Sequence, residues 1–389
     1  MDQLHESTAA RRHNKAADLM AQFAERTGLS SSRTPQRYLW TDAFAVCNLL
    51  GLDQITGDER HRELALRLVD QVHHVLGRHR PDDRRLGWIS GLAAHDGELH
   101  PTRGGLRIGK SLPERRADEP MDERLEWERD GQYFHYLTKW MYALDLLTRR
   151  TGQPLFNEWA REMAQKAHQA FVYNARQGSP NRMYWKLSID LSRPLVASMG
   201  QHDPLDGLLT YAQLEATQAR REPSLRSAIG DFAAMVDPTR MATGDPLGIG
   251  GLLIDAFRLT QLERVGVQAP GLLENLLDAA EIGIRHYSLQ SDLELPAAHR
   301  LAFRELGLAI GLAALERSEW SAASPAVRAR LDRLLSYVPL RDAIETFWLQ
   351  AEHRDVGSWT NHQNINEVML ATSLEPSGFL LIPPVRVNH

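Results

Sequence analysis

Five side chains in this sequence could carry acid–base chemistry, and each lies near the start of an apolar segment. They are Asp42, Asp130, Asp206, His135 and His202. Asp42 interrupts an apolar run, where burial would raise its pKa and make it a general acid; a structural salt bridge is the alternative. Asp206 or Asp130 would stay ionised near a helix start and act as the base. One neutral and one ionised carboxyl group are the requirement for hydrolysis of a glycosidic bond.

The two histidines support a different reaction. A histidine can move protons at a carbon next to a carbonyl, as an epimerase or isomerase must. His135 lies four residues before Lys139 on an apolar segment, so a satisfied core histidine is the alternative role. If Asp42 lay against a buried arginine or lysine and faced away from the central cavity, His135 or His202 would take first place and epimerisation would be favoured over hydrolysis. Asp203 and Asp245 each precede proline, which is typical of a helix N-cap.

Aromatic and polar residues in the connecting segments are candidates for binding a substrate. They are Trp40, Trp88, Trp127, Tyr133, Trp185, Arg107, Arg300, Trp359 and His362. Aromatic rings mixed with carboxylates and histidines suit polar ligands that have apolar faces, sugars among them.

The elements that must position these residues are helices in alternating pairs. Residues 38–50 and 133–147 are apolar almost all round, as buried helices are, whereas residues 59–76 have one apolar face. Further pairs begin at Asp203, at Asp245 and near Ala298. Residues 362–373 form a sixth buried helix, with residues 14–27 or 342–351 as its outer partner. The repeat predicts an all-α fold, an α/α toroid of about six helical hairpins in a single domain over 1–389. In such a ring the inner helices begin at one mouth.

Two inserted loops, at about 86–125 and 180–200, interrupt the repeat at the rim. Asp96-Gly97 predicts a β-hairpin turn, and Pro194 argues for extended structure in the second loop. The first loop contains GGLRIGKS, which matches the phosphate-loop pattern. A true phosphate loop follows a buried strand and opens a helix, and the flanking residues here predict neither. Arg103, Arg107 and Lys110 remain candidates for holding an anionic group, and a solvated loop is the alternative.

Composition limits the classes of partner. The chain has 389 residues, a net charge of −5 and one cysteine, Cys47. The charge argues against nucleic acid, and the single cysteine excludes a disulfide framework or a thiolate-rich zinc site. No segment has the length of a signal peptide core or a membrane span, so a cytoplasmic location is expected. We expect a small-molecule or oligosaccharide ligand, no metal and no cofactor; the oligomeric state is left open.

This organisation resembles the six-hairpin glycosidase-like superfamily, whose members are α/α toroids that act mostly on carbohydrates. Trp40-Thr41-Asp42 is similar to a W-x-D stretch of the unsaturated glucuronyl hydrolases in that superfamily. The resemblance implies a carbohydrate-active enzyme, first of all a glycoside hydrolase with paired carboxylates at the mouth of the ring. A sugar epimerase or isomerase is the second possibility, and a non-catalytic binding or scaffold protein is the third.

Overall fold

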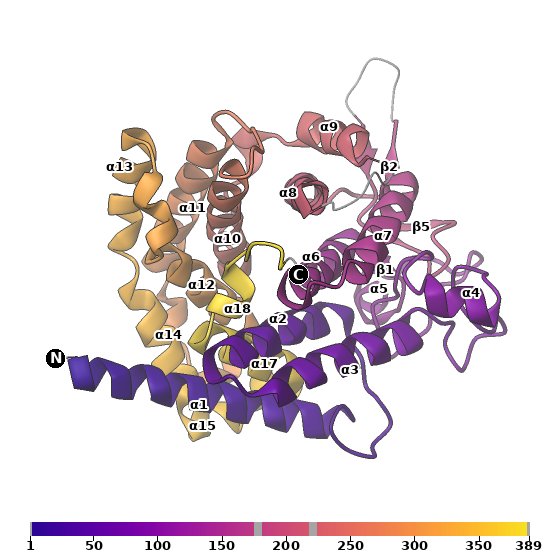
Figure 1. Ribbon diagram of the computed structural model, residues 1–389, viewed down its shortest axis with the longest axis horizontal. Helices are drawn as coiled ribbons and strands as arrows, with labels where there is room; N and C mark the ends of the chain where they lie inside the picture. Colours follow the sequence, from indigo (N-terminus) through magenta and orange to yellow (C-terminus); the bar gives the residue numbers. More distant parts are fainter. Residues whose placement is uncertain (1, 175–180, 218–223, 387–389) are drawn as a thin grey trace. The chain divides into compact units, whose positions relative to one another are not determined.

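The structure is a computed structural model that describes residues 2–174, 181–217 and 224–386 (Figure 1). The described residues form eighteen α-helices and five strands of two or three residues each. The chain divides into two compact units. Unit 1 comprises Met1–Ser31, Asn48–Arg62 and Asp237–Ile382, and unit 2 comprises Ser32–Cys47, Glu63–Val236 and Pro383–His389. The prediction of a single domain stays a prediction.

Unit 2 contains two helical hairpins built as the hydrophobic pattern predicts. Helices α6 (Phe134–Thr151) and α8 (Asp203–Thr217) are buried on nearly all sides and pack against each other. Helix α7 (Leu155–Phe171) covers α6, and α9 (Arg226–Met235) covers α8, each through one apolar face. Helix α6 ends at Gly152, whose φ of 71° is a left-handed cap. The first part of α2 (Leu39–Thr56) and most of α3 (Glu59–Leu76) also belong to this unit.

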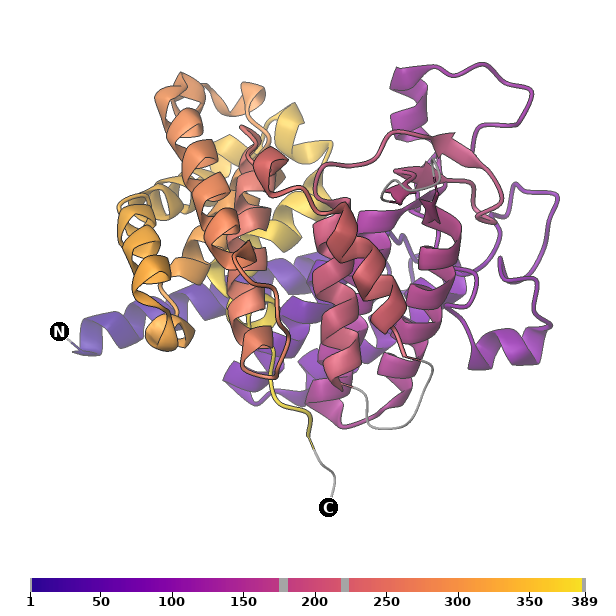
Figure 2. The same cartoon turned by 90° about the horizontal axis from the view of Figure 1, so that it is seen from above.

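Unit 1 repeats the arrangement with three inner helices. Helix α12 (Ala302–Leu315) packs between α10 (Pro246–Glu263) and α17 (Gln363–Leu374). A Cβ on Gly250 would lie 2.1 Å from the carbonyl oxygen of Gly307, so glycine is needed where α10 and α12 approach most closely. Figure 2 shows the orange helices of this unit side by side, with the yellow C-terminal helices next to them.

The outer helices of unit 1 settle which segment covers the sixth buried helix. Helix α11 (Leu272–Leu289) covers α10 and also contacts α13 (Pro325–Leu335). Helix α1 (Asp2–Arg26) packs along α17, and Arg26 forms an ion pair with Glu367. Helix α14 (Pro339–Leu349) contacts both α12 and α17. The N-terminal segment is therefore the outer partner of α17, and the segment 342–351 fills the angle between two inner helices. The short helices α15 (Ala351–Arg354), α16 (Gly357–Thr360) and α18 (Ser377–Leu380) complete the unit.

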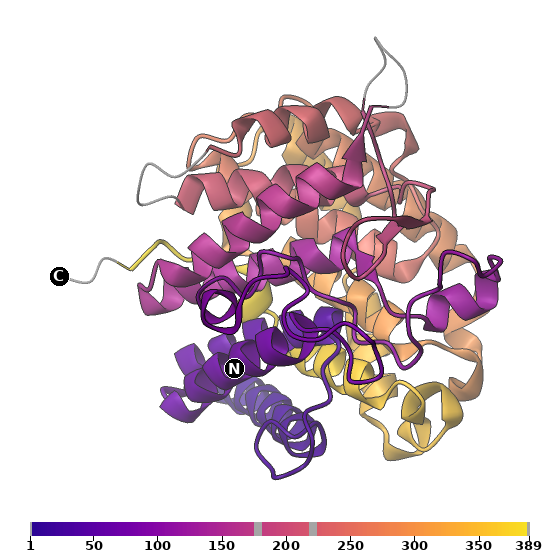
Figure 3. The same cartoon turned by 90° about the vertical axis from the view of Figure 1, so that its right-hand side faces the viewer.

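The two insertions of unit 2 differ from each other in structure (Figure 3). Asp96-Gly97 does not form a hairpin turn: it lies in α4 (Ala94–Leu99). A Cβ on Gly97 would lie 2.0 Å from the ring of Trp88, so this glycine allows close packing and not a reversal of the chain. Later in the same insertion lies α5 (Glu123–Glu128).

The second insertion, whose residue 180 lies outside the described ranges, is extended as predicted. Strand β4 (Lys186–Leu187) pairs antiparallel with β1 (Gln132–Tyr133) and with β5 (Pro194–Val196). Strand β3 (Arg182–Met183) pairs with β2 (Val172–Tyr173). Pro194 begins the edge strand β5, where a missing N–H is tolerated.

Among the described residues there is neither a membrane-spanning helix nor a candidate metal-binding group. None of their helices is long and apolar enough to cross a bilayer. Nor do three or more histidine, cysteine, aspartate or glutamate side chains gather there in a group that could hold a metal ion.

Candidate functional site

The first turns of α6 and α8 bring a histidine and two aspartates together in unit 2. His135 lies at the start of α6, and its Nδ1 is 3.6 Å from Oδ1 of Asp203, the first residue of α8. One turn further along α6, the Lys139 ammonium is 2.6 Å from Oδ1 of Asp206. The predicted residues His135 and Asp206 are thus in one cluster. Asp203, which the sequence assigned to helix capping, joins them.

Burial shifts the pKa values of Asp203 and His135 in this cluster in opposite directions. The pKa of Asp203 is raised to about 8, first by burial and then by the negative charge of Asp206, against the opposing effects of Lys139 and the Gly200 N–H. Burial also lowers the pKa of His135 to about 4. At neutral pH the Asp203 carboxyl is therefore protonated and the His135 imidazole is uncharged. Among the described residues, neither Asp203 Oδ2 nor His135 Nδ1 has a hydrogen-bond partner.

Gly200 lets the Asp203 carboxyl take this place. A Cβ at Gly200 would lie 2.6 Å from Oδ2 of Asp203, closer than two such atoms can approach. The backbone N–H of Asp203 donates to the carbonyl of Gly200, so the turn before α8 folds back on its own first residue.

An aromatic wall made by Trp127, Tyr133 and Trp185 continues from His135. The ring centroids of Tyr133 and Trp185 lie 5.3 and 6.4 Å from that of His135, and those of Trp127 and Trp185 are 5.0 Å apart. A cavity of about 260 Å³ opens on this wall and is lined by Met121, Glu123, Glu126, Trp127, Tyr133, Trp185, Val196 and Ser198. Three of the predicted substrate-binding aromatics are therefore brought together.

A buried ion pair holds the wall in place. Trp127 lies on α5, and Trp185 directly precedes β4. The fully buried Lys186 on β4 reaches α5, where its Nζ lies 2.9 Å from Oε1 of Glu126. The ammonium also donates to the carbonyl oxygens of Glu126 and Arg129. Breaking this pair would leave a buried charge and release Trp127 from Trp185.

Two tyrosines complete the surroundings of His135. The hydroxyls of Tyr38 and Tyr136 are 2.7 Å apart. Burial raises the pKa of Tyr38 to about 12, so the pair remains uncharged in the physiological range. The Tyr136 ring stands edge-on to His135 at 4.8 Å. Neither tyrosine was among the site residues predicted from the sequence, although Tyr136 directly follows His135.

Asp42 is not part of this cluster. Its carboxylate lies 3.5 Å from the Arg37 guanidinium, with both side chains buried, and accepts a hydrogen bond from the N–H of Tyr38. Burial raises the pKa of Asp42 to about 6, and Arg37 opposes that shift. The pair fastens the first turn of α2 to the chain before it. This is the structural salt bridge that the sequence left open as the alternative to a catalytic acid at Asp42.

Asp130 and Arg107 are also engaged in the fold. Asp130 is fully buried, and its carboxylate lies 2.8 Å from Nη1 of Arg107 and 3.4 Å from Nη1 of Arg80. The backbone N–H groups of Gly109 and Gly131 donate to its other oxygen. The four donors occupy both oxygens of the Asp130 carboxylate, and Arg107 is engaged in this ion pair. Both residues fix the loop that contains GGLRIGKS.

Unit 2 also contains three further residues that were predicted for the site: His202, Trp40 and Trp88. His202 directly precedes Asp203 and is half-buried; its carbonyl accepts the N–H of Asp206. Trp40 is buried against Phe44, and Trp88 is buried beside Arg78. These two tryptophans pack within the protein and offer no exposed ring face.

The site residues predicted in unit 1 also make contacts within the protein. Arg300 is buried and forms an ion pair with Glu305 at 2.6 Å. Trp359 is buried and stacks on Trp348. His362 precedes α17 and contacts Phe303. The candidate catalytic side chains therefore lie together in unit 2.

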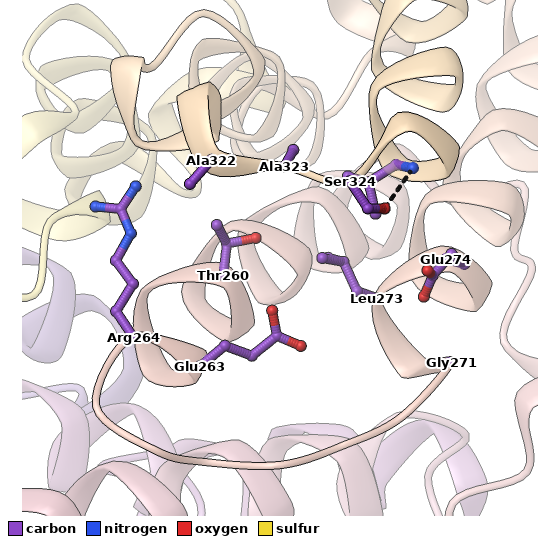
Figure 4. Close-up of a pocket in the computed structure, with 10 residues that line it drawn as sticks. Thr260, Glu263, Arg264, Gly271, Leu273, Glu274, Ala322, Ala323 and Ser324 are labelled. Atoms are coloured by element: carbon purple, nitrogen blue, oxygen red, sulfur yellow. Dashed lines mark hydrogen bonds between the residues drawn. The ribbon is translucent and has the colours of Figure 1, made fainter.

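Unit 1 has a cavity of its own, of about 440 Å³ (Figure 4). The carboxylates of Glu263 and Glu274 line it; burial and then the charge of Glu274 raise the pKa of Glu263. The hydroxyl of Ser324, at the upper edge in Figure 4, accepts the N–H of Val327 as a helix cap. No histidine is among the residues lining this cavity. Its polar groups thus offer less acid–base chemistry than the cluster in unit 2.

The similarities of this chain to known proteins are similarities to solved structures. No protein-family model and no curated protein matches the sequence. A family 76 glycoside hydrolase from a bovine Bacteroides thetaiotaomicron strain matches at a TM-score of 0.52 and 9% identity, over 94% of this chain and 77% of that chain. The two proteins share a fold. This likeness confirms the predicted fold class, an all-α fold of the α/α toroid type.

Two cellobiose 2-epimerases match less well. The one from Spirochaeta thermophila is 14% identical, with a TM-score of 0.46 over 86% of each chain. The one from Bacillus thermoamylovorans is 9% identical, with a TM-score of 0.45 over 78% of this chain and 76% of that chain. Similarities of this size define no reaction, so the chemistry must be argued from the site.

Proposed function

We propose that this protein is a carbohydrate-active enzyme that hydrolyses a glycosidic bond, with Asp203 as the general acid and Asp206 as the base. The observation that carries the proposal is the neutral Asp203 carboxyl next to the Asp206 carboxylate, which is held by Lys139. A glycosidase needs one carboxyl group that still has its proton at working pH and one that has lost it. The high pKa of Asp203 supplies the first group.

Asp203 replaces Asp42 in the pair expected from the sequence. The ion pair of Asp42 with the buried Arg37 meets one part of the condition under which epimerisation was to be favoured over hydrolysis. A second buried carboxyl at the start of α8 changes that order, because the molecule again has a neutral acid beside an ionised carboxylate.

The aromatic wall supports a sugar as the substrate. Trp127 and Trp185 present ring faces and edges next to His135, and Trp127 is half exposed. Aromatic rings bury the apolar C–H faces of a sugar and leave its hydroxyls to polar groups at the edge. Tyr133 and Trp185, which line that cavity, also contact His135, the residue that faces Asp203.

A sugar epimerase is the second candidate, and His135 is the observation that favours it. A neutral imidazole with an unpartnered Nδ1 is a proton acceptor, and the Asp203 carboxyl opposite it is a donor. Such a pair can move protons at a carbon next to a carbonyl.

Product analysis on a panel of oligosaccharides tests the proposal. Hydrolysis creates new reducing ends and shorter chains, whereas epimerisation leaves chain length unchanged and alters one sugar at the reducing end. We expect shorter products that are lost in Asp203→Asn and retained in Asp42→Asn. Unchanged chain length with a new epimer, lost in His135→Gln, would establish the second candidate. Binding without turnover would make the protein a non-catalytic member of the fold.

A further inference from the structure

The loop that contains GGLRIGKS presents one lysine beside the cluster. We infer that Lys110 binds an anionic group of the substrate, so that the sugar hydrolysed here is an acidic one, with a carboxylate, phosphate or sulfate substituent. This inference rests on the proposed function and adds the chemical class of the substrate to it.

Buried charged side chains hold the loop around Lys110 in place. The Asp130 carboxylate accepts the N–H of Gly109 at 3.0 Å and pairs with Arg107 at 2.8 Å. Arg80 donates to the carbonyl oxygens of Lys110 and Ser111 at 2.6 and 2.9 Å. Gly109 has a φ of 92°, and a Cβ there would lie 2.2 Å from the carbonyl oxygen of Arg37. The backbone at Lys110 therefore has one conformation.

The side chain of Lys110 points toward the tyrosines that surround His135. Its Nζ lies 5.5 Å from the ring centroid of Tyr38, whose hydroxyl contacts that of Tyr136. Tyr136 in turn touches His135, and all of these residues belong to unit 2. Lys110 is half-buried, as are Tyr38 and Tyr136. A ligand resting on these tyrosines would meet the ammonium at its edge.

Lys110 differs from the other lysines of the site in having no counter-ion. Lys139 pairs with Asp206, and Lys186 pairs with Glu126. In the part of the chain that the structure describes, no carboxylate lies within 4 Å of the Lys110 ammonium. The exposed Glu128 acts on the pKa of Tyr38 through its charge but forms no ion pair with Lys110.

An ammonium in this position suits an anion better than a neutral hydroxyl. The face of Tyr38 attracts the cation only weakly, because a ring quadrupole does not replace a counter-ion. A charge-assisted hydrogen bond is about twice as strong as a neutral one, and it gains further in a half-buried site. Lysine acts as a point charge, so carboxylate, phosphate and sulfate would all be accepted.

Paired sugars that differ only in charge test the inference. Methyl glucuronide with methyl glucoside, mannose 6-phosphate with mannose, and galactose 6-sulfate with galactose are titrated by ligand-observed NMR. We expect at least one anionic member to bind the wild-type protein about tenfold more tightly than its neutral partner, since tenfold corresponds to about 1.4 kcal/mol. Lys110→Gln should abolish that preference without weakening the neutral sugar, and Lys110→Arg should keep most of it. Lys166→Gln, on the outer helix α7, is the control and should change neither affinity.

The outcomes separate this inference from the proposed function. Equal binding of anionic and neutral sugars by the wild-type protein would overturn the role of Lys110 and leave the hydrolase proposal standing. A preference for the anion that survives in Lys110→Gln would also overturn it. If no sugar of either kind bound, both the inference and the proposed function would be contradicted.

Discussion

Helices α8 and α10 begin with the same three residues, Asp-Pro-Leu, yet the two aspartates do different things. Asp245 is the N-cap of α10: its side chain accepts the N–H of Leu247 at 3.3 Å and pairs with Arg304 at 3.3 Å. About a third of that side chain is exposed. Asp203 is 6% exposed, has an oxygen without a partner among the described residues, and faces His135.

Two differences in sequence separate these helix starts. The third residue after the first aspartate is Asp206 in α8 and Gly248 in α10, so only α8 has a second carboxyl group in its first turn. The helix that packs on α8 offers His135 and Lys139 at the same level. An N-cap motif therefore specifies where a helix begins, and the neighbouring helix decides whether the capping residue can do chemistry.

Substitutions of Asp203 and Asp245 should differ most in their effect on catalysis. Asp203→Asn should lower kcat/KM for the hydrolysed sugar by at least about 100-fold, because an amide cannot protonate the leaving group. Asp245→Asn should leave the rate unchanged, since asparagine is an equally good cap. Steady-state kinetics on both purified variants, with circular dichroism to verify folding, make the comparison. Equal rates in the two variants would remove Asp203 from the mechanism.

The same two variants should differ in how stability depends on pH. The folded protein keeps a proton on Asp203 up to pH 8, whereas the unfolded chain loses it near pH 4, so folded wild type binds more protons in between. Its stability therefore falls as pH rises from about 4 to 8, by up to about 1.4 kcal/mol per pH unit. Asp203→Asn should be more stable than wild type at pH 8, with the difference vanishing near pH 4. Asp245→Asn should follow wild type across the range. Urea unfolding at several pH values measures this, and parallel curves for wild type and Asp203→Asn would contradict it.

Gly200→Ala should impair catalysis without removing any reactive group. The new Cβ would meet Asp203 Oδ2 at 2.6 Å and push the carboxyl away from His135. We expect a loss of about tenfold in kcat, since a shift of about 1 Å in a catalytic group costs up to 100-fold. Gly230→Ala is the matched control, because a Cβ there meets nothing within 4 Å. A Gly200→Ala variant as active as the Gly230→Ala protein would show that the position of the Asp203 carboxyl is unimportant.

Lys139→Met should have the smallest effect, a shift of the pH profile. Lys139 lowers the pKa of Asp203, so its loss should move the alkaline limb of kcat/KM to higher pH. It also lowers the pKa of His135, so any limb due to that histidine should move upward as well. The pH–rate profile of the variant checks both directions. A shift toward lower pH would contradict the assigned charges.

Much of the fold follows from sequence because it depends on local pattern. The all-round apolar segments became α6, α8, α10 and α12, and Gly152 ended α6 as expected. Asp96-Gly97 misled because turn propensity is weak beside tertiary packing: the bulk of Trp88 requires a glycine there.

The site was harder to predict because its chemistry depends on pairs of residues distant in sequence. The sequence singled out His135, Asp206, Trp127, Tyr133 and Trp185, which lie near one another in unit 2, and their roles stay predictions. Nothing in the sequence shows that Arg37 neutralises Asp42 or that Arg107 is bound to Asp130. For Asp203, the one available signal was Asp206 three residues later, since two acids in one turn repel each other and raise a pKa.

The protonation state of Asp203 is the central claim, and it can be measured directly. The carboxyl carbon of Asp203, assigned in ¹³C-labelled protein by its absence from the Asp203→Asn spectrum, is followed by NMR from pH 3 to pH 10. The structure predicts a midpoint of about 8. A midpoint for Asp203 near 4, the value of an ordinary aspartate, would contradict its role as the acid.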